Sequence, residues 1–260
     1  MLTLGIDIGS TACKCVVLQD GKEIIGKAVV GLGTGTVGAQ NAFEEALKDA
    51  GVTREQISSV YATGYGRFTF PMADNQKSEI CCHAKGIHSL LPDVRTIIDI
   101  GGQDIKALKI NEKGMLINFV MNDKCAAGTG RFLDVMARVL NVRTEELGAL
   151  DANAEGEVSI SNTCTVFAES EVISKLSSNV RLEDLVRGIH TSVAKRVASL
   201  AFRNGIIEKV TMSGGVALNE GVVRALGREL KTDIIVHEDC QLAGALGAAL
   251  FAYEESSKEK

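Results

Sequence analysis

The chain has 260 residues, a length that suits one large domain or two modest ones. Of these residues 45% are hydrophobic and 23% charged, as is typical of a globular protein. Its net charge of -5 excludes the broad basic surface with which proteins bind nucleic acids or anionic membranes. No apolar run approaches the length of a membrane span, so the sequence predicts a protein without a transmembrane segment.

The N-terminal segment MLTLGIDIGS has no cationic residue before its apolar stretch and contains Asp7, so we interpret it as a strand and not as a signal peptide. No two of the seven cysteines are spaced as CxxC, which argues against a zinc ribbon or a thioredoxin-type redox site. Reduced thiols and a cytoplasmic location are therefore expected.

The first strands of the chain recur further along it. A shift of 92 residues places 4–22 on the segment ending at 114, so that Asp7 falls on Asp99. The same shift pairs Ile8 with Ile100, Gly9 with Gly101 and Lys14 with Lys106. Each copy predicts a meander of three strands with a glycine turn after the first strand. Duplication at such a long period indicates two related lobes.

The glycine turns suit phosphate groups. A turn without a Cβ lets backbone N–H groups approach a phosphate, and Ser10 and Thr11 add hydroxyl donors. Asp7 and Asp99 offer the oxygen ligands that Mg²⁺ prefers. The lysines that follow carry positive charge, although a lysine on a strand is more often a solvated edge residue. The glycine-rich stretch GLGTGT at 31–36 has neither a P-loop nor a GxGxxG spacing, and we interpret it as a loop.

Two solitary cysteines stand close to predicted helices. Cys125 in NDKCAAGTG precedes the periodic segment RFLDVMARVL, and Cys164 in SNTCTVFAES precedes a second helical pattern. A helix N-terminus favours an anion such as a thiolate. Two thiolates are too few for a [4Fe–4S] cluster, which takes four, but a symmetric dimer supplies two from each chain. From chemistry alone, burial as small core residues is the favoured interpretation.

The remaining cysteines and the histidines show no metal-ligand spacing. Cys13 and Cys15 share one strand face and are expected in the core, and Cys81, Cys82 and Cys240 have no visible partners. His83 is expected to be packed on a helix, and His88, His190 and His237 are expected to be isolated.

A third glycine element, VTMSGGVALN at 210–219, predicts a strand, a Gly-Gly turn and the start of a helix. Such a helix start is a plausible seat for a nucleoside or its phosphates, although it also fits a simple strand-to-helix turn. Together, DIGST, DIGGQD and SGGVALN resemble the phosphate-1, phosphate-2 and adenosine motifs of the superfamily of acetate kinase, sugar kinases, Hsp70 and actin. The resemblance implies an α/β fold of two ribonuclease-H-like lobes with ATP in the cleft.

The lobe boundaries expected from this resemblance are 1–94 with the C-terminal helix at about 243–260 for lobe I, and 95–242 for lobe II. The helix LAGALGAALFAYEE is expected to return across the lobe interface, where its small residues allow close packing.

The cysteine segments NDKCAAGTGRFLDVMA and SNTCTVFAESEVISKL closely resemble the activators, or archerases, of (R)-2-hydroxyacyl-CoA dehydratases. The resemblance implies a homodimer that shares one [4Fe–4S] cluster through Cys125 and Cys164. It further implies that ATP hydrolysis drives one electron from ferredoxin or flavodoxin to a separate iron–sulfur dehydratase, in anaerobic amino-acid fermentation.

Site residues follow from the resemblance. Asp7 is expected to hold Mg²⁺, and Asp99 and Gln103 are expected to orient the attacking water. The expected ATP or ADP contacts are Ser10, Thr11, Ala12, Cys13, Lys14, Gly101, Gly102, Gln103, Asp104, Asp134, Gly214, Gly215, Asn219 and Gln241. Three alternatives remain: the ATPase subunit of a benzoyl-CoA-type reductase, a small-molecule kinase, and a non-catalytic nucleotide sensor.

Overall fold

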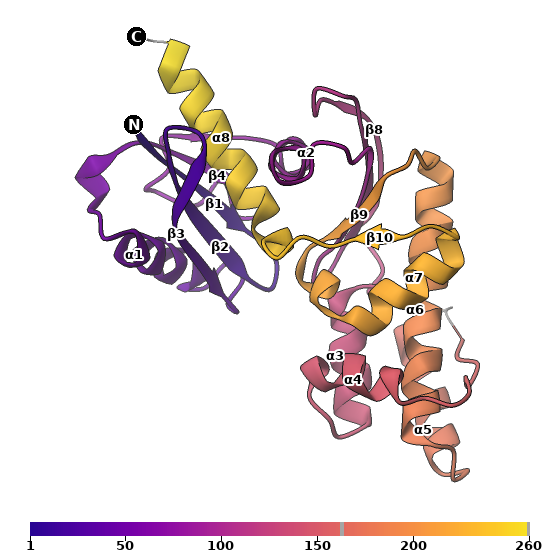
Figure 1. Ribbon diagram of the computed structural model, residues 1–260. Helices are drawn as coiled ribbons and strands as arrows, with labels where there is room; N and C mark the ends of the chain where they lie inside the picture. Colours follow the sequence, from indigo (N-terminus) through magenta and orange to yellow (C-terminus); the bar gives the residue numbers. More distant parts are fainter. Residues whose placement is uncertain (162–163, 259–260) are drawn as a thin grey trace. The chain divides into compact units, whose positions relative to one another are not determined.

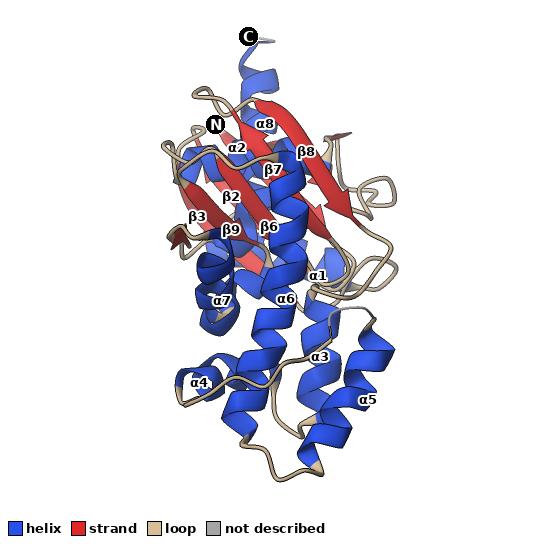
Figure 2. Cartoon of the chain, turned by 90° about the vertical axis from the view of Figure 1, so that its right-hand side faces the viewer, coloured by secondary structure: helices blue, strands red, loops and turns tan. Residues whose placement is uncertain are grey.

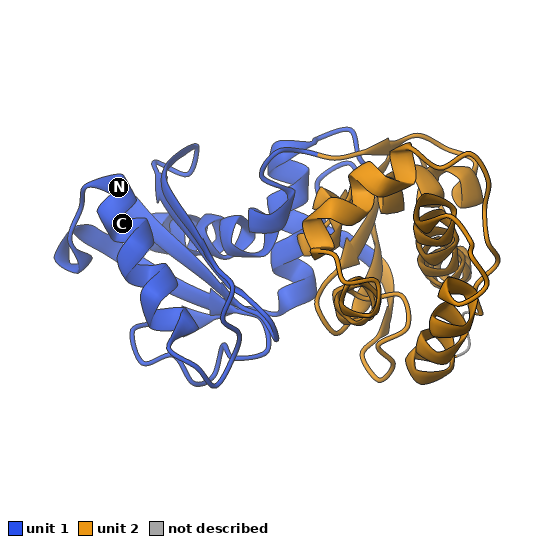
Figure 3. Cartoon of the chain, turned by 90° about the horizontal axis from the view of Figure 1, so that it is seen from below, with its two compact units in different colours: residues 1–94, 110–117, 237–260 blue, residues 95–109, 118–236 orange. Residues whose placement is uncertain are grey.

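The computed structural model describes residues 1–161 and 164–258, which form two compact units (Figure 3). Unit 1 comprises Met1–Val94, Ile110–Ile117 and the segment from His237 to the C-terminal end, and unit 2 comprises Arg95–Lys109 and Asn118–Val236. Each unit is built on a mixed five-stranded sheet with helices, the α/β architecture expected from the sequence. Among the described residues, no helix has the length and apolar character needed to cross a membrane.

The sheet of unit 1 has the strand order β3-β2-β1-β4-β5 (Figure 1). Its strands are β1 (Leu2–Ile8), β2 (Cys13–Gln19), β3 (Glu23–Val30), β4 (Ile57–Thr63) and β5 (Asn75–Gln76). The first three form an antiparallel meander, and β4 and β5 continue the sheet in parallel from β1. The predicted sequence of strand, glycine turn, strand, turn and strand is confirmed.

Helices cover both faces of this sheet, and the side-chain alternation along β2 shows why. Helix α1 (Gly38–Ala50) buries Phe43 against the face that includes Cys15 and Val17. Val16 and Leu18 point to the other face and pack against α8 (Ala243–Lys258). Because successive side chains of a strand point to opposite faces, a continuous apolar run fits a strand buried on both sides. A short 3₁₀ turn, Arg54–Gln56, precedes β4.

The small residues of α8 let its backbone lie against its neighbours. Helix α2 (Glu79–Leu90) meets α8 at two glycines. A Cβ added at Gly86 would overlap the carbonyl of Ala243, and one added at Gly247 would overlap the carbonyl of Cys82. Gly5 of β1 meets the Ala245 carbonyl in the same way. The close packing predicted for this helix therefore occurs inside unit 1.

Unit 2 repeats the sheet of unit 1, with strand order β10-β9-β6-β7-β8. Its strands are β6 (Thr96–Ile100), β7 (Ile105–Ile110), β8 (Leu116–Asn122), β9 (Val210–Ser213) and β10 (Ile234–Ile235). The register pairs Asp99 with Lys106, as it pairs Asp7 with Lys14 in unit 1. The duplication inferred from the shift of 92 residues is therefore confirmed at the level of strand pairing.

The helices of unit 2 include a long central one, α6 (Leu182–Asn204), which packs against α4, α5 and α7 (Figure 2). The other helices are α3 (Gly130–Val139), α4 (Leu147–Ala152), α5 (Thr165–Leu176) and α7 (Glu220–Leu230). Helices α3 and α5, which follow the two cysteine segments, pack against each other. Further 3₁₀ turns lie at Thr144–Glu146, Gly215–Leu218 and, in unit 1, Cys240–Leu242.

Candidate functional site

The turn between β1 and β2 is tight, because the N–H of Gly9 donates to the carbonyl of Ala12 at 3.0 Å. Ser10 and Thr11 lie at the partly exposed tip of this turn, and in the described part of the chain their hydroxyls form no hydrogen bond. Cys13 is fully buried in the core, and burial raises the pKa of its thiol to about 11. The buried, neutral thiol is therefore not accessible to a ligand, which leaves only the main chain of Cys13 for a contact at the turn.

Asp7 is the second-last residue of β1, close to this turn, and has 3% of its surface exposed. Its Oδ2 lies 3.4 Å from Lys14 Nζ, a long contact, while its buried Oδ1 has no hydrogen-bond partner within residues 1–161 and 164–258. A buried carboxylate oxygen without a partner is unfavourable, because it has lost its water and gained no donor in return. A hard cation such as Mg²⁺ would satisfy that oxygen, so the expected metal ligand has suitable chemistry.

Two glycine-containing loops, one at 31–36 and one that includes Gly64, contact the end of β1 and the turn that follows it. The sequence interpretation assigned neither loop to the site. In the loop at 31–36, Thr34 N–H donates to the carbonyl of Gly9 at 2.8 Å, and a Cβ at Gly33 would overlap the carbonyl of Ser10. Gly64, with φ of +84°, leaves room for the unpartnered Asp7 oxygen, against which a Cβ would press. The glycines of these two loops are the sequence signal that could have predicted their close approach to the β1–β2 turn.

His83 lies close to Asp7, although they are 76 positions apart in the chain. A Cβ built on Gly244 would stand 3.0 Å from His83 Nε2 and 3.1 Å from Asp7 Oδ2, so both side chains border the same point at the start of α8. The expectation that His83 is packed is confirmed, because it is 4% exposed, and the helix packing also brings it to the phosphate turn. Gln241 lies three residues before Gly244, in the 3₁₀ turn, and is partly exposed.

The turn of unit 2 is held by buried charges. Lys106 Nζ lies 2.6 Å from Asp104 Oδ2 and 3.3 Å from Asp99 Oδ2, and all three side chains are less than 5% exposed. Ser213 Oγ donates to Asp99 Oδ1 at 2.9 Å. Lys106 is therefore buried, and the alternative of a solvated edge lysine is wrong. Charge-assisted contacts of this kind fix the orientation of the Asp99 carboxylate.

The same turn receives the start of α3. The N–H groups of Gly130 and Arg131 donate to the carbonyls of Gly101 and Gly102, each at 2.9 Å. Gln103 is the exposed side chain of the turn. Its amide therefore remains available to a ligand or a water molecule.

The Gly-Gly element lies against β6, next to this turn. Gly214 has φ of +83°, and a Cβ there would stand 2.9 Å from Asp99 Oδ1. Gly215 is exposed. Asn219 caps α7: its Oδ1 accepts from the N–H groups of Gly221 at 3.0 Å and Val222 at 3.2 Å. The strand, glycine turn and helix expected here are confirmed, with a 3₁₀ turn inserted before α7.

Asp134 of α3 makes its side-chain hydrogen bond with the connection that follows its own helix. It is exposed on α3 and accepts a hydrogen bond from Thr144 Oγ1 at 3.0 Å. It borders an open pocket of roughly 600 Å³ that Arg138 and Arg143 also line. The described contacts therefore link Asp134 to the α3–α4 connection and to neither glycine turn.

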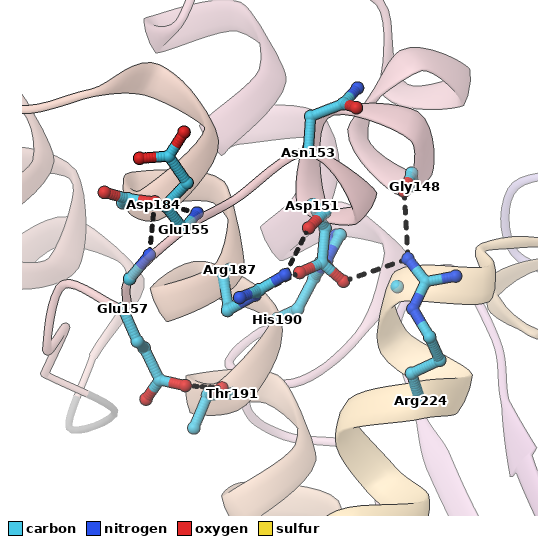
Figure 4. A network of polar contacts seen from close by, with 12 residues as sticks. Gly148, Asp151, Asn153, Glu155, Glu157, Asp184, Arg187, His190, Thr191 and Arg224 are labelled. Carbon is cyan, nitrogen blue, oxygen red and sulfur yellow. Dashed lines mark hydrogen bonds and ion pairs between the residues drawn. The ribbon is translucent and has the colours of Figure 1, made fainter.

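A buried polar network joins α4, α6 and α7, and the sequence interpretation missed it (Figure 4). Asp151, 1% exposed, lies 3.0 Å from Arg187 Nε and 3.2 Å from Arg224 Nη2. His190 Nδ1 is 3.3 Å from Asp151 Oδ2, an electrostatic contact outside hydrogen-bond geometry, and its Nε2 is 3.2 Å from Asn219 Nδ2. The expectation that His190 is isolated is wrong, because folding brings Asp151 and Asn219 to it from two distant segments.

Charge contacts set the protonation of the network. Burial by itself raises the pKa of Asp151, but the contact with His190 and the hydrogen bond from Arg187 outweigh burial and lower the pKa to about 2. The carboxylate is therefore ionised at neutral pH.

The two solitary thiols differ from the core cysteines in exposure. Cys125 and Cys164 are both partly exposed, and no disulfide joins any of the seven cysteines. Cys164 is the N-cap of α5, whereas Cys125 is separated from α3 by a tight turn. Next to Cys164, Val166 is 65% exposed and Phe167 68% exposed. Cys13, Cys15, Cys82 and Cys240 are buried, as expected for core residues.

Two duplicated sheets, each with a glycine turn after an acidic residue, and a Gly-Gly loop beside the second turn form the arrangement of the ATPases and kinases that share the actin fold. The model of the BadF/BadG/BcrA/BcrD ATPase family matches residues 4–252. The chain belongs to this ATPase family.

Several characterised proteins are similar over their whole length. The activator of lactoyl-CoA dehydratase of Anaerotignum propionicum is 56% identical over 259 residues, covering 100% of both chains. The (R)-2-hydroxyglutaryl-CoA dehydratase activating ATPase of Acidaminococcus fermentans is 52% identical over 257 residues, covering 98% of each. The solved structure of the activator of the 2-hydroxyisocaproyl-CoA dehydratase from Clostridium difficile, with bound ADPNP, is 56% identical with a TM-score of 0.97 and covers 100% of this chain and 97% of that one.

Proposed function

We propose that this ATPase activates a 2-hydroxyacyl-CoA dehydratase by passing it single electrons at the expense of ATP. The names of the similar proteins support this assignment, and one structural observation carries it. Of the seven cysteines, Cys125 and Cys164 stand partly exposed in the segments before two helices that pack together, and four of the other five are buried. Structural thiols have no reason to be placed in this way.

The proposed redox centre is one [4Fe–4S] cluster held by Cys125 and Cys164 of two identical chains. A cluster takes four thiolates, and one chain has two in this position, so a homodimer completes the set. The exposed apolar residues Val166 and Phe167 on the first turn of α5 suit such an interface, because they exclude water around the thiolates. When bound, the cluster supplies a one-electron redox centre.

The proposed nucleotide contacts come from both units. The Ser10 and Thr11 hydroxyls and the backbone of residues 12–14 bind phosphate in unit 1, and Asp7 Oδ1 binds Mg²⁺. In unit 2, the turn from Gly101 to Asp104 binds phosphate. Gly214, Gly215 and Asn219 form the adenosine side, with Asp134 and Gln241 as further contacts. Each backbone stretch is presented by a tight turn, as phosphate binding requires.

The proposed hydrolytic residues are Asp99 and Gln103. Asp99 is held by Ser213 and Lys106, so its carboxylate has a fixed direction in which to orient the attacking water. Gln103 is exposed at the turn, and its amide can donate to or accept from that water.

ATP is needed because every extra 100 mV of reducing power costs about 2.3 kcal/mol per electron. The proposed electron source is a reduced ferredoxin or flavodoxin in the cytoplasm, and the acceptor is a separate iron–sulfur dehydratase. Nucleotide state supplies the energy only if ATP and ADP favour different conformations of the chain.

The test is a reconstituted dehydration assay under anaerobic conditions. A purified dehydratase is incubated with its 2-hydroxyacyl-CoA, a reduced donor, ATP and this chain. We expect product only when all of them are present, loss of product with Cys164→Ser, and wild-type activation with Cys81→Ser, which changes a thiol outside the proposed site. Activation by the Cys164→Ser variant at the wild-type rate would exclude the proposal.

A further inference from the structure

The adenosine-side loop, Gly214–Asn219, is a short connection whose position depends on its two ends. It consists mainly of the 3₁₀ turn Gly215–Leu218, which joins β9 to α7. Gly215 is exposed, and Leu218 is 60% exposed. A 3₁₀ turn has poorer hydrogen-bond geometry than an α-helix and contributes little rigidity of its own. Strand β9 fixes the first end of the loop, so the support of the second end, at Asn219, decides where the loop lies.

The side chain of Asn219 is committed to contacts within the protein. Its Oδ1 accepts from two backbone N–H groups at the start of α7, so its Nδ2 is the group that faces His190. His190 Nε2 must then accept, which places the ring proton on Nδ1, toward the Asp151 carboxylate at 3.3 Å. The tautomer that Asn219 requires is therefore the one that suits a negative charge at position 151.

The start of α7 lies directly on this histidine–aspartate pair. A Cβ at Gly221 would stand 2.3 Å from His190 Nδ1 and 2.7 Å from Asp151 Oδ2, so only a glycine fits between them and the helix. Arg224, one turn later, donates to both the Asp151 carboxylate and the Gly148 carbonyl. Close packing and charge-assisted hydrogen bonds thus hold the first turn of α7 in one place.

The supporting groups lie where a ligand does not reach. Asp151, His190 and Arg224 come from α4, α6 and α7, and they meet beneath the start of α7 (Figure 4). His190 is 0% exposed and Asp151 is 1% exposed, so neither side chain can touch a nucleotide. Any effect of these two residues on nucleotide binding must therefore pass through the loop that ends at Asn219.

We propose that Asp151, His190 and Arg224 position the adenosine-side loop and thereby set the affinity of the protein for adenine nucleotides, without taking part in hydrolysis. The inference rests on the proposed function, because it takes Gly214–Asn219 as the side of the site that holds adenosine. His190 is the central positioning residue, since it contacts both Asn219 and Asp151.

The physical reason is the cost of ordering a loop when a ligand binds. Without an acceptor at position 190, Asn219 Nδ2 loses its partner, and the amide gains other orientations that also weaken the cap of α7. The loop then occupies several positions, and binding must select one of them, which lowers affinity. The phosphate turns, with Asp99 and Gln103, keep their own contacts, so the rate of hydrolysis in the bound state stays the same.

The test compares His190→Phe with the wild-type dimer by isothermal titration calorimetry with ADP and with the non-hydrolysable analogue ADPNP. His190→Phe keeps the volume of the ring and removes both polar contacts. We expect its Kd to rise about tenfold or more for each nucleotide, and by the same factor within about twofold, because adenosine is common to both. In the ATPase assay, KM should rise by a similar factor, while kcat stays within about twofold of the wild type.

Two variants separate positioning from a general loss of stability. His190→Gln retains an acceptor for Asn219 and should restore most of the wild-type affinity. Asn204→Ala removes another buried amide from α6, at the far end of the helix where it donates to the Ala107 carbonyl, and should keep the wild-type Kd. If His190→Phe does not fold, Arg224→Met decides instead: it keeps the aliphatic stem of a partly exposed side chain, removes the contacts with α4, and should raise both Kd values about threefold or more.

A further variant distinguishes this inference from the proposed function. Gly215→Val adds a side chain to the exposed part of the loop and weakens ADP binding if adenosine lies there. Wild-type affinity in Gly215→Val would remove the proposed adenosine side, and the inference with it. Weak binding in Gly215→Val together with wild-type Kd values in His190→Phe and Arg224→Met would overturn the inference alone. A loss confined to one of the two nucleotides, or a fall in kcat without a rise in KM, would also overturn it.

Discussion

Replacing Asp151 by Asn tests the buried network of unit 2 most sharply. The substitution keeps the size of the side chain and removes one negative charge from contact with Arg187, Arg224 and His190. Because Asp151 is 1% exposed, water does not replace these contacts in the folded protein. The folded state therefore loses stabilisation that the unfolded state never had.

The magnitude follows from the pKa of the carboxyl. It falls from 3.8 to about 2 on folding, and at 1.36 kcal/mol per pKa unit the charged form contributes about 2 kcal/mol of stability at neutral pH. A lowered folded-state pKa gives stability that is present above the unfolded value and is lost as the pH falls through the folded value. The difference between wild type and Asp151→Asn should therefore be about 2 kcal/mol at pH 7 and about half of that at pH 3.

Urea unfolding followed by circular dichroism at pH 7, 4 and 3 measures this difference. Parallel titrations of both proteins cancel the other acid-sensitive contributions. Asp184→Asn is a matched control: Asp184 receives two backbone hydrogen bonds near the surface, so water compensates more of its loss. A difference below about 0.5 kcal/mol at pH 7, or one that does not shrink with acid, would refute the reasoning.

Three further substitutions test the phosphate turn and the helix packing. Asp7→Asn should raise the Mg²⁺ concentration for half-maximal ATPase activity about tenfold or more, because the unpartnered oxygen loses its charge; an unchanged magnesium titration would exclude the metal role. Gly33→Ala should raise the KM for ATP tenfold or more at constant iron content, because its Cβ overlaps the Ser10 carbonyl and overpacking costs about 1–3 kcal/mol. An unaltered KM would show that the loop at 31–36 takes no part in ATP binding. Gly86→Ala should lower the unfolding midpoint, since the clash with the α8 backbone outweighs the gain of about 1 kcal/mol in helix propensity. Gly148→Ala, whose Cβ would have no atom nearer than 3.4 Å, should not lower the midpoint. Equal shifts of the midpoint in the two variants would contradict the packing account.

Much of the fold was predictable because it depends on local patterns that recur. The alignment of Asp7 with Asp99 and of the two following lysines predicted the duplicated hairpin, and both pairs lie opposite each other in the strand register. The glycine turns, the Gly-Gly element and the partly exposed cysteines also follow from short motifs. Each of these features is set by residues close together in the chain.

The rest depends on contacts between residues that are distant in sequence. His83 reaches Asp7 only because α2 and α8 approach each other through Gly86 and Gly247, and no spacing in the chain encodes that meeting. His190 was expected to be isolated because its partners, Asp151 and Asn219, lie on other helices. Sequence periodicity shows which face of a helix is apolar, but it does not show which polar group of another element packs against that helix.

The central claim is that two chains share one cluster through Cys125 and Cys164, and native mass spectrometry of the anaerobically purified protein tests it most directly. The account predicts a dimer that carries the mass of a single [4Fe–4S] cluster, loss of that mass in Cys125→Ser and in Cys164→Ser, and its retention in Cys81→Ser. An iron-free monomer, or a dimer that keeps the cluster in both serine variants at Cys125 and Cys164, would contradict the account.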